Sequence, residues 1–355
     1  MDKTNWKEPI ETYLSDRWKT KIQISNWKEL SGGACQDNIA IDTLSRALDE
    51  NKNLRTISSQ HSSLVLRTDK AASLLSSLPK KAEFEVALEI FHAGAKTPEP
   101  ILFERDEKII GSPFYLMQRI SGNANARFLV KDASINAYRK EGLARDLAIN
   151  LSKIHSVRPN QTKYLSDTTL PFLGGTSEKS YIQESVLALR KTLSEIPEPH
   201  PAIELALNWL DDQAEHFVPD RMVLVHGDFR TGNFMVSPSG LEGILDFEFA
   251  HWGDRHEDVA WLCMRDWRFG KVNKEVGGFA DRKEFYDEYE KASGIGLDAK
   301  KVTFWEIVGN LRWAIGSIQQ AYRHLSGKDK GIELAAIGRR TSEMEYEALR
   351  LIHAR

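Results

Sequence analysis

The sequence changes character near residue 120, and this change limits the folds that the chain can adopt. Before it, short apolar segments alternate with turn residues, as in ISNWKELSGGACQDNIAIDTL and LVLRT, which is typical of strands. After it, apolar residues recur mainly at helical spacing. Strand-rich and helix-rich regions that follow one another indicate an α+β fold. We predict two lobes, a small β-rich N-terminal lobe over 1–120 and a larger helical C-terminal lobe over 121–355.

The periodicity also predicts individual helices. The first lobe is expected to open with a helix over 6–18 and to contain one inner helix over 80–94, with Phe84, Ala87, Leu88 and Phe91 on its apolar face. The second lobe is expected to contain helices over 133–157, 179–195, 200–217, 282–292, 298–325 and 332–353. One β segment, 222–249, interrupts this helical region. Because clefts between lobes commonly hold ligands, we expect the functional site there.

The stretch LVHGDFRTGNFMV, at the start of that β segment, carries the first chemical signal. An apolar strand runs into His226, Gly227 and Asp228, and Asn233 follows five residues after the aspartate. A tight turn requires glycine and aspartate, but it does not require that asparagine. The spacing D-x-x-x-x-N is that of a kinase catalytic loop, where the aspartate accepts the proton of the substrate hydroxyl and the asparagine binds a metal ion. We therefore predict Asp228 as the catalytic base and Asn233 as a metal ligand.

A second acidic motif lies on the returning strand LEGILDFEFA, where Asp246 follows Asp228 by 18 residues. Burying an acid at the end of an apolar strand costs free energy unless a cation is near. Asp246 and Glu248 lie two residues apart and point the same way on a strand. With Asn233 they form an oxygen-rich set that suits Mg²⁺. For Glu248, a metal contact and a supporting or substrate-binding role both remain open.

The N-terminal lobe is expected to bind the phosphates of a nucleotide. In LSGGACQDN, Gly32 and Gly33 allow the backbone to approach phosphate oxygens closely. Arg67 ends the strand LVLR, where kinases have a lysine, and its fixed charge can hold a phosphate. Either Glu83 or Glu85, on the next helix, could pair with Arg67 and fix its position.

Five further residues complete the predicted site. The segment FYLMQRI leads from one lobe to the other, so the backbone of Met117, Gln118 and Arg119 is expected to contact the adenine. Arg230, in the catalytic loop, and Arg312, in the helix FWEIVGNLRWAIGSIQQAY, are candidates for holding the substrate. For Arg312, a salt bridge to another helix is the alternative. His226 is expected to brace the loop by hydrogen bonds, with a catalytic role as the less favoured alternative.

Together these motifs resemble the aminoglycoside phosphotransferase / choline kinase-like family, which has a protein-kinase-like fold. The resemblance spans roughly 25–265 and also includes GSPFYLMQRISG, LAINLSKIHSV and GILDFEFAHWGDRHEDVAWLC. It is strongest to the branch related to the phosphotransferase portion of acyl-CoA dehydrogenase fusion proteins, which has LR at the position of the kinase lysine. The resemblance implies that Asp228 is the base, that Asn233 and Asp246 bind the metal, and that Asp258 braces the catalytic loop.

We therefore predict an ATP- and Mg²⁺-dependent phosphotransferase that acts on a hydroxyl group of a small molecule. A hydroxyacyl-CoA-type substrate is favoured by the branch resemblance and by a run of basic residues near the C-terminus: Arg312, Arg323, His324, Lys328, Lys330, Arg339 and Arg340. An aminoglycoside or a choline-like alcohol is the alternative. A non-catalytic nucleotide-binding regulatory module is the alternative of another class, and the arginine at the lysine position is its chief support.

The composition excludes several other classes of protein. A net charge of −3 argues against a general nucleic-acid binder. No run approaches the roughly 18 apolar residues of a membrane span, and the charged N-terminus has no apolar signal core. Two cysteines form no disulfide framework, which fits a reducing compartment. We expect a soluble, cytoplasmic enzyme with a small-molecule partner and no nucleic-acid or membrane partner; the sequence gives no indication of the oligomeric state.

Overall fold

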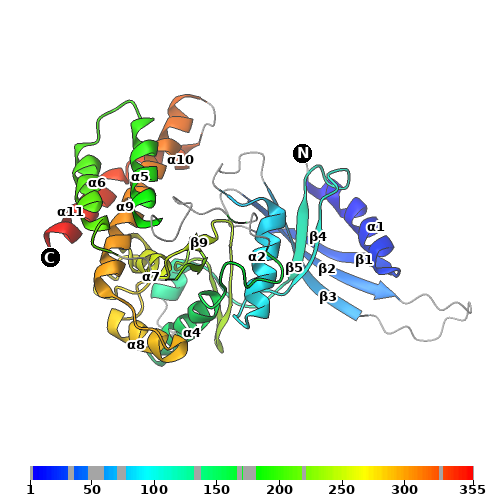
Figure 1. Ribbon diagram of the computed structural model, residues 1–355. Helices are drawn as coiled ribbons and strands as arrows, with labels where there is room; N and C mark the ends of the chain where they lie inside the picture. The colour runs from blue at the N-terminus through cyan, green and yellow to red at the C-terminus, as the bar shows by residue number, and fades with distance from the viewer. Residues whose placement is uncertain are drawn as a thin grey trace, which may run out of the picture.

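The computed structural model describes residues 3–30, 36–46, 60–69, 77–131, 137–165, 170, 181–217, 221–327 and 331–354. The chain forms two lobes, and its two ends lie in different lobes (Figure 1). The first 118 residues contain an antiparallel sheet, and most of the remainder is helical. The predicted α+β, two-lobed fold is therefore confirmed.

The sheet of the N-terminal lobe has five strands in the order β1-β2-β3-β5-β4, and every neighbouring pair is antiparallel. Its strands are β1 (Lys21–Glu29), β2 (Gln36–Arg46), β3 (Gln60–Asp69), β4 (Pro100–Glu104) and β5 (Phe114–Gln118). Helix α1 (Lys7–Trp18), preceded by the short helix η1 (Lys3–Trp6), packs on the sheet through Ile10 and Leu14, which are fully buried in its core. This small core is separate from the larger one that fills the rest of the molecule.

Helix α2 (Lys80–His92) lies between the sheet and the C-terminal lobe (Figure 1). The predicted apolar face is confirmed only in part, because Ala87 is buried, whereas Phe84, Leu88 and Phe91 are half-buried. The helix also buries Val86 and Ile90, which belong to the core of the larger lobe. Both faces of this helix carry apolar residues, so the periodicity alone could not show which face turns inward.

The C-terminal lobe is built mainly from helices, most of which match predicted segments, whereas the short helices over 126–131 and 265–268 were not predicted. They are α3 (Ala126–Lys131), α4 (Ala137–Ile154), α5 (Tyr181–Ser194), α6 (Pro201–Ala214), α7 (His256–Cys263), η2 (Arg265–Arg268), α8 (Arg282–Ser293), α9 (Ala299–Leu325), α10 (Ile332–Gly338) and α11 (Thr341–His353). The single helix predicted over 332–353 is wrong, since the chain breaks into α10 and α11 after Gly338. At Gly338 a Cβ atom would lie 2.4 Å from the Cβ of Ala321, so this glycine lets α10 approach α9 closely.

The predicted β segment forms two small antiparallel pairs. Strand β6 (Val223–Val225) pairs with β9 (His251–Gly253), and β7 (Phe234–Ser237) forms a hairpin with β8 (Gly240–Ile244). An isolated bridge between Asn123 and Val236 ties this hairpin to the segment that joins the lobes.

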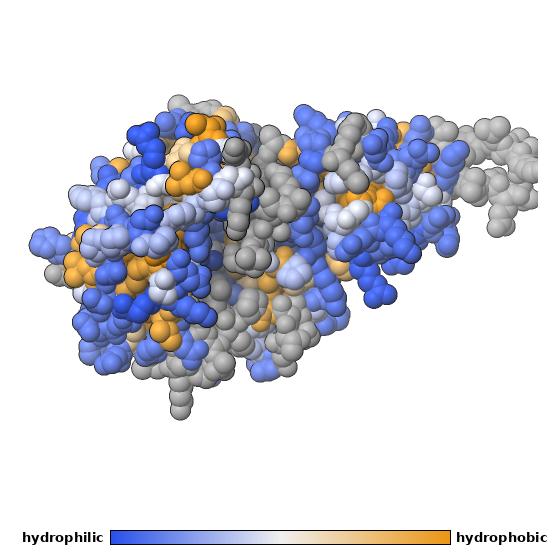
Figure 2. Space-filling model, turned by 90° about the horizontal axis from the view of Figure 1, so that it is seen from above, coloured by the Kyte–Doolittle hydropathy of each residue, from blue (hydrophilic) through white to orange (hydrophobic). Residues whose placement is uncertain are grey.

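Within the part of the chain that the structure describes, no helix combines the length and the apolar character that crossing a membrane requires. On the face seen in Figure 2, hydrophilic residues cover much of the coloured surface and apolar residues form separate patches.

Candidate active site

The loop between β6 and β7 holds the predicted base in a conformation that requires glycine at one position. Gly227 has φ +79°, and a Cβ atom there would lie 2.1 Å from the carbonyl oxygen of Phe249, so only glycine fits. The two carboxylate oxygens of Asp258 accept the backbone N–H groups of His226 at 2.8 Å and Gly227 at 3.0 Å. One buried acid, Asp258, therefore fixes the path of the chain just before Asp228.

Asp258 is itself held by a buried histidine. His155 Nε2 lies 3.1 Å from Asp258 Oδ2, and His155 Nδ1 lies 2.8 Å from the hydroxyl oxygen of Tyr289. Burial acts to raise the pKa of Asp258, but the hydrogen bond from His155 and the nearby charges outweigh it, and the pKa is lowered. The acid therefore stays charged and keeps both N–H groups of the loop bound.

His226 lies in the position of a bracing residue. Its Nε2 lies 3.0 Å from the carbonyl oxygen of Leu245, and its Nδ1 lies 3.2 Å from the backbone N–H nitrogen of Asp228. One ring nitrogen thus donates to a carbonyl and the other accepts from an amide, which fits a neutral imidazole. Its ring packs against Phe229 and Phe247, so the residue links the catalytic loop to the strand end that carries Asp246.

The carboxylate of Asp228 is surrounded by N–H donors. Asn233 Nδ2 donates to Oδ2 at 2.7 Å, and Trp261 Nε1 donates to Oδ1 at 2.8 Å. Arg230 Nε lies 2.9 Å from Oδ1 and 3.1 Å from Oδ2. The structure therefore brings Asn233 to Asp228 as the spacing predicted, and it adds Trp261 and Arg230, the latter predicted only as a substrate-binding residue.

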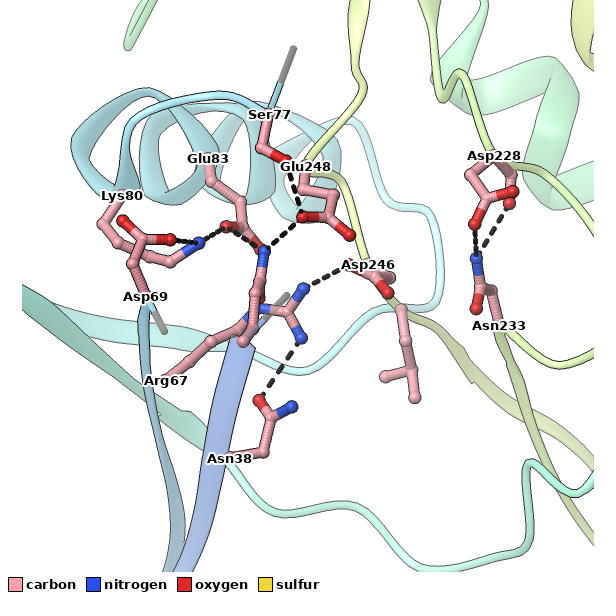
Figure 3. Close-up of polar contacts among 12 residues, drawn as sticks. Asn38, Arg67, Asp69, Ser77, Lys80, Glu83, Asp228, Asn233, Asp246 and Glu248 are labelled. Atoms are coloured by element: carbon pink, nitrogen blue, oxygen red, sulfur yellow. Dashed lines mark hydrogen bonds and ion pairs between the residues drawn. The ribbon is translucent and has the colours of Figure 1, made fainter. Parts of the chain in front are cut away.

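Arg67 connects the two lobes (Figure 3). Its Nε lies 2.6 Å from Glu83 Oε1 on α2, and its Nη2 contacts Asp246 of the C-terminal lobe. Of the two candidate partners, it is Glu83 that pairs with Arg67, whereas Glu85 forms an ion pair with Lys81. The guanidinium is buried among these acids, so its position and its charge are both fixed.

Two acids at this site have opposite pKa shifts. Burial acts to raise the pKa of Asp246, but the adjacent Arg67 guanidinium outweighs it, and the pKa is lowered. For Glu248, burial and then the charge of Asp246 raise the pKa to about 7. Glu248 Oε2 accepts hydrogen bonds from Gln36 at 2.8 Å and Ser77 at 3.0 Å, so it links the helical lobe to the strand that follows the Gly-rich loop.

The arrangement of oxygen atoms fits a magnesium ion. The N–H of Leu245 donates to the carbonyl oxygen of Asn233 at 2.9 Å, which brings Asp246 beside Asn233. The amide nitrogen of Asn233 is used by Asp228, so its oxygen is the atom left for a cation. Figure 3 shows Asp246 between the Arg67 cluster and the Asp228–Asn233 pair. Among the described residues, no group of three or more His, Cys, Asp or Glu side chains gathers as a metal cage, so the ion would take further oxygens from phosphate or water.

The remaining predicted residues have mixed placements. Gly32 and Gly33 lie outside the described residues. In the segment that joins the lobes, Met117 pairs with β3, and the N–H groups of Gln118 and Arg119 already donate to the carbonyls of Glu99 and Ser63. A nucleotide base would therefore have to use other groups of this segment. The guanidinium of Arg312 lies over the ring of Trp261, at 5.7 Å from its centre.

Three residues that the sequence reasoning missed take part in the site. Lys80 is buried and lies 2.5 Å from Glu83, three residues later on the same helix. Gln36, just after the Gly-rich loop, also contacts Glu83 at 3.3 Å. Trp261 stands three residues after Asp258, and this spacing places both side chains on one face of α7. That spacing was a usable signal for Trp261, whereas the Gln36 contacts depend on tertiary structure.

Comparison with known proteins agrees with this geometry. Residues 46–295 match the phosphotransferase enzyme family, so the chain belongs to that family. A relative, acyl-CoA dehydrogenase family member 10 of Mus musculus, is 31% identical over 208 residues, which are 57% of this chain and 18% of that protein. The chain thus corresponds to only about a fifth of that relative's length.

Two solved structures have the same fold. A mutant of aminoglycoside phosphotransferase APH(4)-Ia, in a ternary complex with ADP and hygromycin B, matches with a TM-score of 0.59 at 14% identity, over 96% of this chain and 98% of that one. A choline/ethanolamine kinase family protein from Mesorhizobium loti matches with a TM-score of 0.56 at 16% identity, over 92% of this chain and 88% of that one. At such identities the likeness establishes the fold alone.

Proposed function

We propose that the chain is an ATP- and Mg²⁺-dependent phosphotransferase that phosphorylates a hydroxyl group of a small molecule. The observation that carries this proposal is that Asp246, which pairs with Arg67 of the N-terminal lobe, lies near the Asp228–Asn233 pair (Figure 3). Membership of the phosphotransferase family supports it. In this proposal residues 1–120 hold the nucleotide, and residues 121–355 supply the base and the acceptor site.

The chemistry follows from the position of each side chain. Asp228 orients the acceptor hydroxyl and takes its proton while the hydroxyl oxygen bonds to the γ-phosphorus and the bond to the ADP oxygen breaks. Arg67, held by Glu83 and Asp246, keeps a positive charge beside the phosphates. Asn233 and Asp246 would hold Mg²⁺, which would supply further neutralisation of phosphate charge. Catalysis by such a site is mainly positioning and electrostatics.

The acceptor is proposed to bind in a cleft of about 970 Å³ in the C-terminal lobe. A row of tryptophans, Trp261, Trp267 and Trp313, leads to this cleft from Asp228, with ring centres 5.8 and 5.7 Å apart. The last of them donates from Nε1 to Asp266, which lines the cleft.

The charges of the cleft favour an anionic acceptor. Arg265 and Arg340 form ion pairs with neighbouring acids. Arg127 and Lys131, on α3, line the same cleft and have no ion pair among the described residues. The lining thus has four basic residues against three acids, Asp266, Glu343 and Glu347, and this small excess of positive charge suits an acceptor with phosphate or carboxylate groups, such as a hydroxyacyl-CoA, better than a polycationic aminoglycoside.

The test is ADP release from Mg²⁺–ATP across a panel of hydroxyacyl-CoA thioesters, choline-like alcohols and aminoglycosides. We expect turnover with the thioesters, and we expect Asp228→Ala to abolish turnover while nucleotide binding, measured by calorimetry, is kept. Full activity of Asp228→Ala would contradict the assignment of the base. Nucleotide binding without turnover on any acceptor would favour a regulatory module.

A further inference from the structure

Three N–H groups contact the carboxylate of Asp228, and one of them, the Nε–H of Arg230, is shared between both oxygens. A carboxylate accepts at about four positions, two on each oxygen. Here Oδ1 has contacts from Trp261 and Arg230, and Oδ2 has contacts from Asn233 and Arg230. A hydroxyl group that approaches Asp228 must therefore displace one of these donors.

Arg230 is the donor that can leave. Asn233 is only 5% exposed and uses the same amide group to donate to the backbone oxygen of Asp228 at 2.9 Å. Trp261 is fixed on α7, with its ring packed on Trp267. The side chain of Arg230 is 27% exposed, and its single Nε–H is shared between the two oxygens at the longest of the four distances.

The observed position of Arg230 is nevertheless stabilised by the residues around it. Its guanidinium carbon lies 4.6 Å from the ring centre of Trp267, within range of a cation–π contact. At Gly232 a Cβ atom would lie 2.7 Å from Nη1 of Arg230, so the absence of a side chain there makes room for the guanidinium. An aromatic face and a glycine thus hold Arg230 over the base.

We propose that Arg230 is a positioning residue that covers Asp228 until an acceptor displaces it, and so prevents water from being phosphorylated in the acceptor's place. This inference rests on the proposed phosphotransferase function. With Arg230 in place, a water molecule finds no free acceptor position on Asp228 and is not oriented for attack on the γ-phosphorus. A bound acceptor, held by its own contacts in the cleft, supplies the free energy that moves Arg230 aside.

The test measures ADP release from Mg²⁺–ATP without any acceptor, for the full chain and for Arg230→Gln. We expect the variant to hydrolyse ATP about tenfold faster than the wild type, because loss of a charge-assisted hydrogen bond frees the base. Arg230→Lys keeps a cation within reach of the carboxylate and should stay closer to the wild-type rate. Adding Asp228→Ala to Arg230→Gln should remove the increase, since the hydrolysis needs the base.

The outcomes separate this inference from the proposed function. If the wild type transfers phosphate to an acceptor and Arg230→Gln shows no rise in hydrolysis, Arg230 does not cover the base. If Arg230→Gln unfolds, with a collapsed thermal midpoint, the same comparison is made with Arg230→Met, which removes the donor to Asp228 and keeps an apolar side chain beside Trp267. A wild-type rate of hydrolysis in that variant overturns the proposal. If the wild type neither hydrolyses ATP nor transfers phosphate to any acceptor, the proposed function itself fails.

Discussion

Trp261→Phe tests whether the indole N–H holds the catalytic base. The substitution removes the donor that lies 2.8 Å from Asp228 Oδ1 and keeps an aromatic ring against Trp267. A hydrogen bond to a charged group contributes about 1.5–3 kcal/mol. Since about 1.4 kcal/mol corresponds to a factor of ten, kcat should fall roughly ten- to a hundredfold.

A matched control is available in the same row of tryptophans. Trp313→Phe removes an indole N–H that donates to Asp266, and Trp313 packs on the other side of Trp267. Both variants lose the same atoms and one hydrogen bond to a carboxylate, so a similar loss of thermal stability is expected. Trp313→Phe should raise the KM for the acceptor and leave kcat largely unchanged, because Asp266 lines the cleft and does not contact Asp228.

The assay is steady-state ADP release with ATP and the acceptor varied in turn, together with the thermal midpoint of each variant. A kcat of Trp261→Phe that falls no further than that of Trp313→Phe would refute the reasoning. The loss would then come from altered packing of the tryptophan row, and Trp261 would have no special effect on Asp228.

Two further predictions concern the scaffold of the loop. Gly227→Ala should destabilise the protein by about 2–5 kcal/mol in urea unfolding, because it adds a clash with Phe249 to the roughly 1–2 kcal/mol cost of a left-handed residue. Gly94→Ala is its control, with φ +80° and open space around it, and equal losses in both variants would contradict the clash. Asp254, whose pKa is lowered to about 2 because His256 outweighs the effect of burial, should stabilise the fold above pH 3.8 and lose this effect as the pH falls through 2. The difference in unfolding free energy between wild type and Asp254→Asn should therefore shrink by roughly 2 kcal/mol from pH 4 to 2, and a constant difference would exclude it.

Much of the site could be predicted because several of its residues lie close together in the sequence, within one short loop. The spacing of Asp228 and Asn233 fixes their relation over a few residues, and the structure indeed places Asn233 Nδ2 2.7 Å from Asp228 Oδ2. Helix positions followed from apolar periodicity in the same way, as for α9 over Ala299–Leu325. Such local signals need no knowledge of the rest of the fold.

What could not be predicted depends on contacts between distant segments. Glu83 and Glu85 have the same chemistry. Only the docking of α2 decides that Glu83 contacts Arg67, whereas Glu85 pairs with Lys81. Likewise, the contact between Gln36 and Glu248 joins residues 212 positions apart. The buried face of α2 was predicted only in part for the same reason, since its partner is the other lobe.

The docking of α2 has a consequence for control of the enzyme. In protein kinases, activity is switched by moving the helix that carries the glutamate partner of the phosphate-binding cation. Here Val86 and Ile90 anchor α2 in the larger lobe, and withdrawing them would cost about 3–6 kcal/mol. Glu89 adds to the anchor, since its carboxylate accepts the N–H groups of Lys163 and Tyr164. Fewer than about one molecule in a hundred would have the helix swung out at equilibrium, so movement of α2 would not serve as a switch for the proposed phosphotransferase.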